Sequence, residues 1–135
     1  MALAQLKRFG FGLQALIVLA SDTEQCSSAE IADRIQGEPT QLRKILSQLA
    51  EAGIVEVKQG RTGGYQLARK PEEITLAQIY RALHEEEPQW DRMLETTGSH
   101  LFGQKVHLSF RKIMFDINTQ VIQVLGTYTI ADLQD

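Results

Sequence analysis

The hydrophobic residues change their spacing abruptly at Gly53, and this change constrains the fold more than any other feature of the chain. Before it, aliphatic residues recur every three or four positions, which predicts a helix with one buried stripe. These residues are Leu42, Ile45, Leu46 and Leu49. After it, residues 54–58 and 64–68 alternate as strands do, and the glycine-containing loop between them predicts a hairpin. A helix is therefore followed directly by a two-stranded hairpin.

Two further helices are predicted before this one. The first spans about residues 3–21, where apolar side chains recur at helical spacing. Ser27 and Glu30 have the spacing of a capping box, which predicts the start of the second helix. Gly37 is expected to end the second helix, and Pro39 suits the first turn of the next. In the first helix, Gly10 and Gly12 are interpreted as points of close packing against a neighbour.

The apolar run near the N-terminus could also be mistaken for a signal peptide, because Lys7 and Arg8 precede it. Gln14 and two glycines interrupt the run, which is also too short to span a membrane. We therefore interpret it as a buried helix of a cytoplasmic protein with no membrane partner. The single cysteine, Cys26, fits a reducing compartment and excludes an internal disulfide.

After the hairpin, a capping box at Thr75 and Gln78 predicts a helix ending near residue 83. The pattern weakens over about 85–103, where Trp90 marks one short apolar turn. A long helix is predicted from about residue 104 to 126, with a final turn after it. Its apolar side chains exceed what a helix at the edge of a small monomer covers, and six of them make one seam. The seam residues are Val106, Phe110, Ile113, Ile117, Val121 and Val124.

Charge is distributed unevenly along the 135 residues, although the net charge is only −3. Six cations and two anions lie between Arg43 and Lys70, whereas four cations and eight anions lie from His84 to the end. Helix, turn, helix and hairpin with pooled positive charge describe a winged helix-turn-helix that reads duplex DNA. The candidate contact residues are Ser28, Thr40, Gln41, Arg43, Lys44, Ser47, Gln48, Arg61, Thr62 and Gly63.

The hairpin has its own predicted roles. Gly60, Gly63 and Gly64 allow the backbone to turn and approach a partner closely, and Arg61 supplies charge for a narrow minor groove. Tyr65 and Leu67 are expected to anchor the wing on the core. A glycine-rich hairpin with one arginine is by itself more often only a turn, so the prediction depends on the whole order of elements.

The segment SSAEIADRIQGEPTQLRKILSQLAEAGIVEVKQGRTGGYQLARKPEEITLAQIYRAL (27–83) resembles the Rrf2 family of bacterial transcription regulators. KRFGFGLQALIVLA and TYTIADL resemble the first helix and the C-terminal end of that family. The resemblance implies a winged helix, a homodimer formed through the long helix, and binding to a near-palindromic operator. It places base recognition on the third helix and a minor-groove contact at Arg61.

The chain departs from sensor members of that family, which hold an iron–sulfur cluster with about three cysteines ahead of the long helix. This region has no cysteine, and Ser99 or His100 stands where other members have one. We therefore expect a member without cluster, metal or other cofactor. Cys26 could be a redox switch, but a lone cysteine is more often a small buried side chain. His84, His100 and His107 lack the spacing of a metal site.

The fold class is thus mainly α with a small β-hairpin wing. We expect a DNA-binding domain at 1–83, a variable connection at 84–103 and a dimerisation segment at 104–135. The predicted function is a homodimeric, sequence-specific DNA-binding regulator, a repressor of its operator, with a small-molecule or protein effector. The alternative is a winged-helix protein-interaction module that does not bind DNA. No local motif indicates an enzyme.

Overall fold

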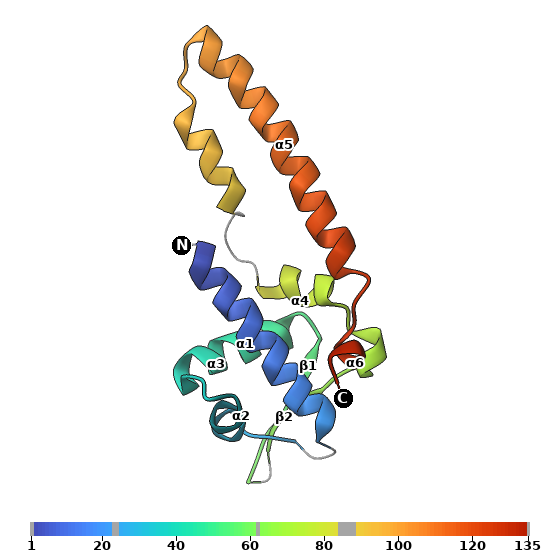
Figure 1. Ribbon diagram of the computed structural model, residues 1–135. Helices are drawn as coiled ribbons and strands as arrows, with labels where there is room; N and C mark the ends of the chain where they lie inside the picture. Colours follow the sequence, from blue (N-terminus) through green and yellow to red (C-terminus); the bar gives the residue numbers. More distant parts are fainter. Residues whose placement is uncertain (1, 23–24, 62, 84–88, 135) are drawn as a thin grey trace.

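The computed structural model describes residues 2–22, 25–61, 63–83 and 89–134. Side chains are described from residue 6 onward in the first of these ranges and from residue 92 onward in the last. The elements follow the predicted order (Figure 1). They are α1 (Ala2–Ser21), α2 (Ser28–Ile35), α3 (Pro39–Glu51), β1 (Val55–Lys58), β2 (Gly64–Leu67), η1 (Pro71–Glu73), α4 (Leu76–Leu83), η2 (Gln89–Thr96), α5 (Leu101–Leu125) and α6 (Ile130–Leu133). The structure confirms a mainly helical fold with one small hairpin.

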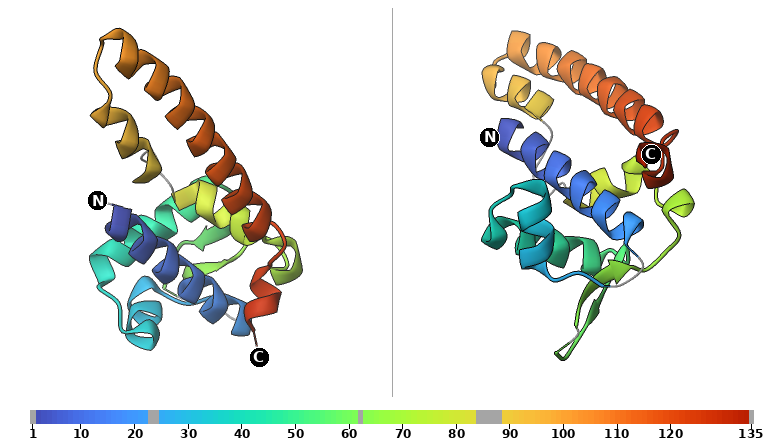
Figure 2. Two further views of the ribbon diagram at one scale, coloured as in Figure 1. Left: turned by 45° about the horizontal axis from the view of Figure 1, so that its top comes forward. Right: turned by 60° about the horizontal axis from the view of Figure 1, so that its bottom comes forward.

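The chain forms two parts, which we call the head and the arm. The head contains α1 to α4, the hairpin and α6, and α1 contacts each of the other head helices. The arm is α5 together with η2, which runs beside its first half, and it leaves the head on the side away from the hairpin (Figures 1 and 2). The hairpin pairs Val55 with Leu67 and Lys58 with Gly64 in an antiparallel register.

The core of the head confirms the predicted apolar stripe of α3. Its four aliphatic residues are at most 2% exposed and pack against Leu16 of α1 and Ile79 of α4 in one cluster. Burial of each such side chain stabilises the fold by about 1.5–3 kcal/mol. This rigid cluster fixes the direction in which the opposite face of α3 points.

Most helix boundaries agree with the capping signals. Ser27 and Glu30 form the predicted box, and so do Thr75 and Gln78. The predicted stop at Gly37 is wrong by one residue, because Gln36 takes the left-handed conformation, with φ 56°. Its side-chain amide donates to the Asp33 carbonyl at 2.7 Å, and this local hydrogen bond offsets the cost of that conformation.

The predicted start of α5 is also wrong, because the helix begins at Leu101 with His100 as its cap. Gly103 reads as a helix boundary in the sequence but lies in the first turn, where a Cβ would be 2.4 Å from the Gly98 carbonyl oxygen. A similar close contact confirms the interpretation of Gly12, whose Cβ would meet Leu83 at 2.6 Å. Among the described residues no atom lies within 4 Å of a Cβ on Gly10, so the interpretation is wrong for this glycine.

The chain returns to the head after α5. The Leu76 amide donates to the Tyr128 carbonyl and the Ile130 amide to the Ile74 carbonyl, both at 3.0 Å. Ile130 is completely buried, and Thr129 and Asp132 cap α6 with a box that was not predicted. The base of the arm is therefore held by α4 on one side and by this return segment on the other.

Candidate nucleic-acid interface

The outer face of α3 presents the polar side chains expected of a recognition helix. Thr40, Arg43, Lys44 and Ser47 are exposed, whereas Gln41 is half-buried near the helix start. Two of the four exposed residues are cations, and the remaining two carry hydroxyls that can donate or accept hydrogen bonds. The face can therefore attract a duplex and contact base edges at the same time.

Glu38 is the N-cap of α3 and is not among the predicted contact residues. Its carboxylate accepts hydrogen bonds from the Thr40 amide at 3.0 Å and the Gln41 amide at 2.8 Å. These bonds lower the pKa of the Glu38 carboxyl; desolvation opposes them, and a hydrogen bond from the Thr40 side chain and the charge of Arg43 add smaller lowerings. The signal in the sequence was the acidic residue directly before a proline at the first helical position.

Gln48 is oriented differently from the other candidates on α3. Its side-chain oxygen accepts a short hydrogen bond from the Arg8 guanidinium, which also donates to the Leu83 carbonyl at 3.1 Å. Gln48 is half-buried and turned toward α1. In this arrangement Gln48 connects α3 to α1 and to the end of α4, and the outward-facing candidates do not include it.

The glycines of the wing are required by the hairpin itself. Gly60 has a φ of 102°, which favours glycine, and a Cβ on Gly63 would lie 2.2 Å from the Lys58 carbonyl oxygen. Arg61, between them, is exposed at the hairpin tip. Thr62 lies outside the described residues. The structural role of the glycines leaves Arg61 as the charged group that the tip presents.

The wing is anchored by the segment that precedes α2. Cys26 and Tyr65 exchange backbone hydrogen bonds of 3.0 and 2.7 Å, which form an isolated antiparallel bridge between this segment and β2. Gly64 lies so close to this segment that a Cβ would be 2.6 Å from the Cys26 carbonyl oxygen. Tyr65 and Leu67 pack against the core, as predicted. Ser28 follows at the start of α2 and is half-buried.

The thiol of Cys26 is buried, with 5% of the residue exposed, and donates to the Asp22 carboxylate at 3.0 Å. Burial first, and the Asp22 carboxylate second, raise the pKa of the thiol to about 11. Asp22 in turn pairs with Arg34 at 3.1 Å. The thiol is thus protonated at neutral pH, which argues against a reactive redox switch and agrees with a small buried side chain.

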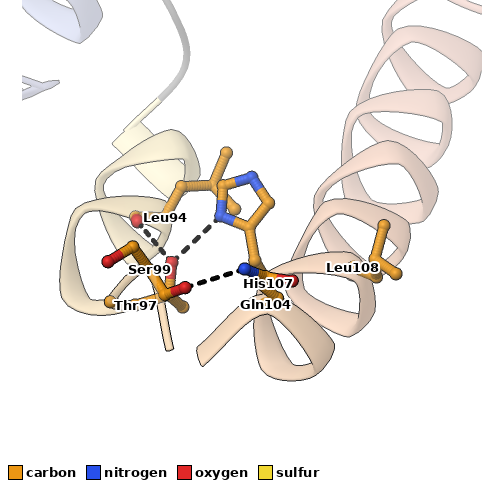
Figure 3. A pocket seen from close by; sticks show the side chains of 7 residues that line it. Leu94, Thr97, Ser99, Gln104, His107 and Leu108 are labelled. Carbon is orange, nitrogen blue, oxygen red and sulfur yellow. Dashed lines mark hydrogen bonds between the residues drawn. The ribbon is translucent and has the colours of Figure 1, made fainter. Parts of the chain in front are cut away.

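A pocket of about 550 Å³ lies between η2 and α5, in the region where the resemblance would place an iron–sulfur cluster (Figure 3). Thr97 Oγ1 lies 3.0 Å from His107 Nδ1, and the side-chain amide of Gln104 donates from Nε2 to the Ser99 carbonyl at 2.7 Å. The lining offers hydroxyl and amide groups and one imidazole, but no thiolate. These residues do not fit a cluster, which needs cysteine sulfur.

Of the other metal ligands considered in the sequence, the structure describes only His100 and His107. Within the described ranges, no group of three or more His, Cys, Asp and Glu side chains could hold a metal ion. His84, the acidic residues 85–87 and the side chain of Trp90 lie outside the described part of the chain. In the described residues we also find no helix with the length and apolar character needed to cross a membrane.

A recognition helix with exposed cations, followed by a hairpin anchored on the same core, defines a winged-helix DNA-binding protein. The chain belongs to the Rrf2 family, whose model, described as an iron-dependent transcriptional regulator, matches residues 6–135. The chain is accordingly a DNA-binding transcriptional regulator, and the protein-interaction alternative is not favoured.

Relatives and solved structures support this assignment. The chain is 25% identical to the HTH-type transcriptional regulator NsrR of Shouchella clausii over 125 residues, or 91% of this chain and 83% of that protein. It is 28% identical to Protein rrf2 of Nitratidesulfovibrio vulgaris over 98% of this chain and 87% of that protein. The structure of CymR, the global cysteine regulator of B. subtilis, matches with a TM-score of 0.65 and 27% identity, over 93% and 92% of the two chains.

Proposed function

We propose that two copies of the chain associate through α5 and bind a near-palindromic operator as a cytoplasmic repressor. The observation that carries this proposal is the apolar surface of the arm. Leu101, Leu108 and Phe115 are 70%, 66% and 70% exposed. Because these residues are spaced seven apart, the angular position around the helix axis changes by only about 20° from one to the next. They therefore form one stripe along the helix. A helix of a soluble monomer rarely leaves such a stripe in water.

The predicted seam contributes to this interface in part. Ile113 and Val124 remain 45% and 55% exposed, whereas the other four seam residues are half-buried within one chain. At about 100° per residue, Ile113 and Val124 lie far around the helix from the Leu101 stripe. The arm thus exposes apolar side chains on two sides. We infer that the partner packs around the arm and contacts both the stripe and the exposed seam residues.

In the proposed complex each head contacts one half of the operator. Arg43, Lys44 and Ser47 face the major groove from α3, together with Thr40 and Gln41 at its start. Arg61 reaches the minor groove or its phosphates, while the Gly63 backbone and Ser28 contact the phosphate chain. Gln48 supports α3 through Arg8, as described above. A small molecule or a partner protein then acts as the effector that releases the DNA.

Selection of duplexes from a random pool, followed by mobility-shift titration, tests this function. Lys44→Ala and Arg61→Ala should each abolish detectable binding to the selected operator without changing the melting temperature. Arg111→Ala and Lys105→Ala are matched controls, because both remove an exposed cation from the arm. Equal binding by the head variants and the arm controls would contradict the proposed interface.

The stoichiometry is tested separately by light scattering of the purified protein, alone and on the selected duplex. The proposal expects two chains in solution and two chains on each operator. Half-sites one helical turn apart, or about 34–36 Å, are the natural spacing for two heads on one face of the duplex. A single chain on an operator without internal symmetry would overturn the dimeric model while leaving DNA binding intact.

A further inference from the structure

We propose that Glu38 is a specificity-determining residue, which directs the start of α3 to the amino group of a cytosine and away from the phosphate backbone. This inference rests on the proposed function, because it assumes that α3 enters the major groove. Glu38 is exposed and precedes the first turn of that helix.

The start of a helix ordinarily binds anions, because its first backbone amides have no partner within the helix. In the first turn of α3, residues 39–42, no amide remains available. Pro39 has no N–H group, and the amides of Thr40 and Gln41 donate to the two oxygens of the Glu38 carboxylate. The Leu42 amide donates to the Glu38 carbonyl at 3.0 Å. The first turn therefore has no amide left to hold a phosphate.

The cap also brings a negative charge to this end of the helix. The pKa of the Glu38 carboxyl is lowered by the same two amides, so the group is ionised throughout the neutral range. A carboxylate at this position repels a phosphate at close range. Phosphate attraction must then come from the cations on the next turn, Arg43 and Lys44, and from Arg61 on the wing.

An ionised carboxylate offers about four lone-pair sites, of which the two backbone amides and the Thr40 side chain occupy three here, so the Glu38 carboxylate can accept one further hydrogen bond. In the major groove, a carboxylate is matched by a donor, and cytosine N4 is the base group that such side chains accept from. The two backbone bonds fix the carboxylate in place, so little conformational freedom is lost when it contacts a base. The geometry thus favours a C·G pair opposite the start of α3.

The test compares Glu38→Ser with Glu38→Asp and with Glu51→Gln. Serine keeps a good N-cap but removes the charge, and aspartate keeps both. Glu51→Gln is the matched control, because Glu51 is an exposed carboxylate at the other end of the same helix. Each variant is used in pool selection and in titrations with random duplex at several salt concentrations. Thermal melting by circular dichroism confirms that each variant is folded.

For Glu38→Ser we expect the preference for one C·G pair in each half-site to fall by about 5- to 150-fold, the range for a single base contact. Affinity for random duplex should rise several-fold with a steeper salt dependence, since a phosphate can then occupy the helix start. Glu38→Asp should keep the preference of the wild type, and Glu51→Gln should leave it unchanged.

Two outcomes would overturn the inference while the proposed function stands. One is a Glu38→Ser protein that selects the same operator, with the same affinity for random duplex, as Glu51→Gln. The other is a uniform loss of affinity for all duplexes, which is what a purely structural cap would cause. A wild-type protein that binds no duplex at all would overturn the inference and the proposed function together.

Discussion

The head and the arm use apolar residues in opposite ways. Helix α3 has 13 residues and buries four large aliphatic side chains, whereas α5 has 25 residues and buries only Gly103 and Met114. The most exposed apolar side chains of α5 are nevertheless as large as those in the head core. The head therefore completes its core within one chain, and the arm does not. This difference in burial separates the part that completes its core as a single chain from the part that we propose a second chain covers.

The largest effect is expected from charging the arm. Leu108→Glu combined with Phe115→Glu should convert the proposed dimer to a folded monomer. In a symmetric interface both chains carry each substitution, so every new carboxylate is buried in two copies. Loss of the linked second head should lower operator affinity by about 10²- to 10⁴-fold. Light scattering and operator titration measure the two effects. Ser109→Glu, an exposed polar site on the same helix, is the control, and an unchanged dimer in the double variant would break the comparison.

A second prediction compares truncations in the two parts. Leu46→Ala should lower the free energy of unfolding by about 2–5 kcal/mol, because Leu46 is completely buried in the head. Leu101→Ala, placed in the monomeric Leu108→Glu/Phe115→Glu background, should change it by less than about 0.5 kcal/mol. Urea denaturation monitored by circular dichroism measures both. Similar losses in the two variants would mean that the arm contributes to the core of one chain.

Glycine substitutions sharpen the comparison inside the head. Gly64→Ala should cost about 1–3 kcal/mol, since the new Cβ would meet the fixed carbonyl oxygen of Cys26. It should also weaken operator binding by displacing the wing. Gly10→Ala in α1 meets nothing within 4 Å, so alanine should raise stability by up to about 1 kcal/mol. Chemical denaturation of the two variants would reveal whether the wing is as tightly fitted as the structure indicates.

The smallest effect concerns the thiol of Cys26. The native thiol should react with an alkylating agent at pH 8 about 100-fold more slowly than the unfolded protein, because its pKa is about 11 rather than 9.0. Because the pKa of the Cys26 thiol is higher in the folded chain, the protonated thiol stabilises the fold fully below about pH 9, and this contribution is lost as the pH rises through about 11. Cys26→Ser should accordingly show a flatter stability profile between these values. Rapid labelling of the native protein would contradict the buried geometry.

Much of the head could be predicted because its signals are local. The α3 stripe, the boxes at Ser27 and Thr75 and the anchoring of Tyr65 follow from spacing along one segment. Contacts between distant segments could not be predicted in this way. Arg8 and Gln48 are 40 residues apart, and the approach of Gly64 to Cys26 depends on how the wing folds back.

The candidate site shows the same division. The exposure of Arg43, Lys44 and Arg61 follows from the helical wheel and the hairpin tip. Glu38 was missed because serine, threonine, aspartate and asparagine are the usual caps, so a glutamate before proline did not stand out. The early start of α5 was missed because the packing of Gly103 against Gly98 requires knowledge of the tertiary fold.

The return of the chain from α5 to the start of α4 has a mechanical consequence. The segment that follows α5 pairs with the start of α4 through the Leu76–Tyr128 and Ile130–Ile74 hydrogen bonds, so the base of the arm, which is about 37 Å long, is attached to the head at this point. The end of α4 accepts a hydrogen bond from Arg8, whose guanidinium also donates to Gln48 of α3, so a continuous set of contacts joins the arm to the recognition helix. We therefore expect a change in the tilt of α5 to alter the orientation of α3.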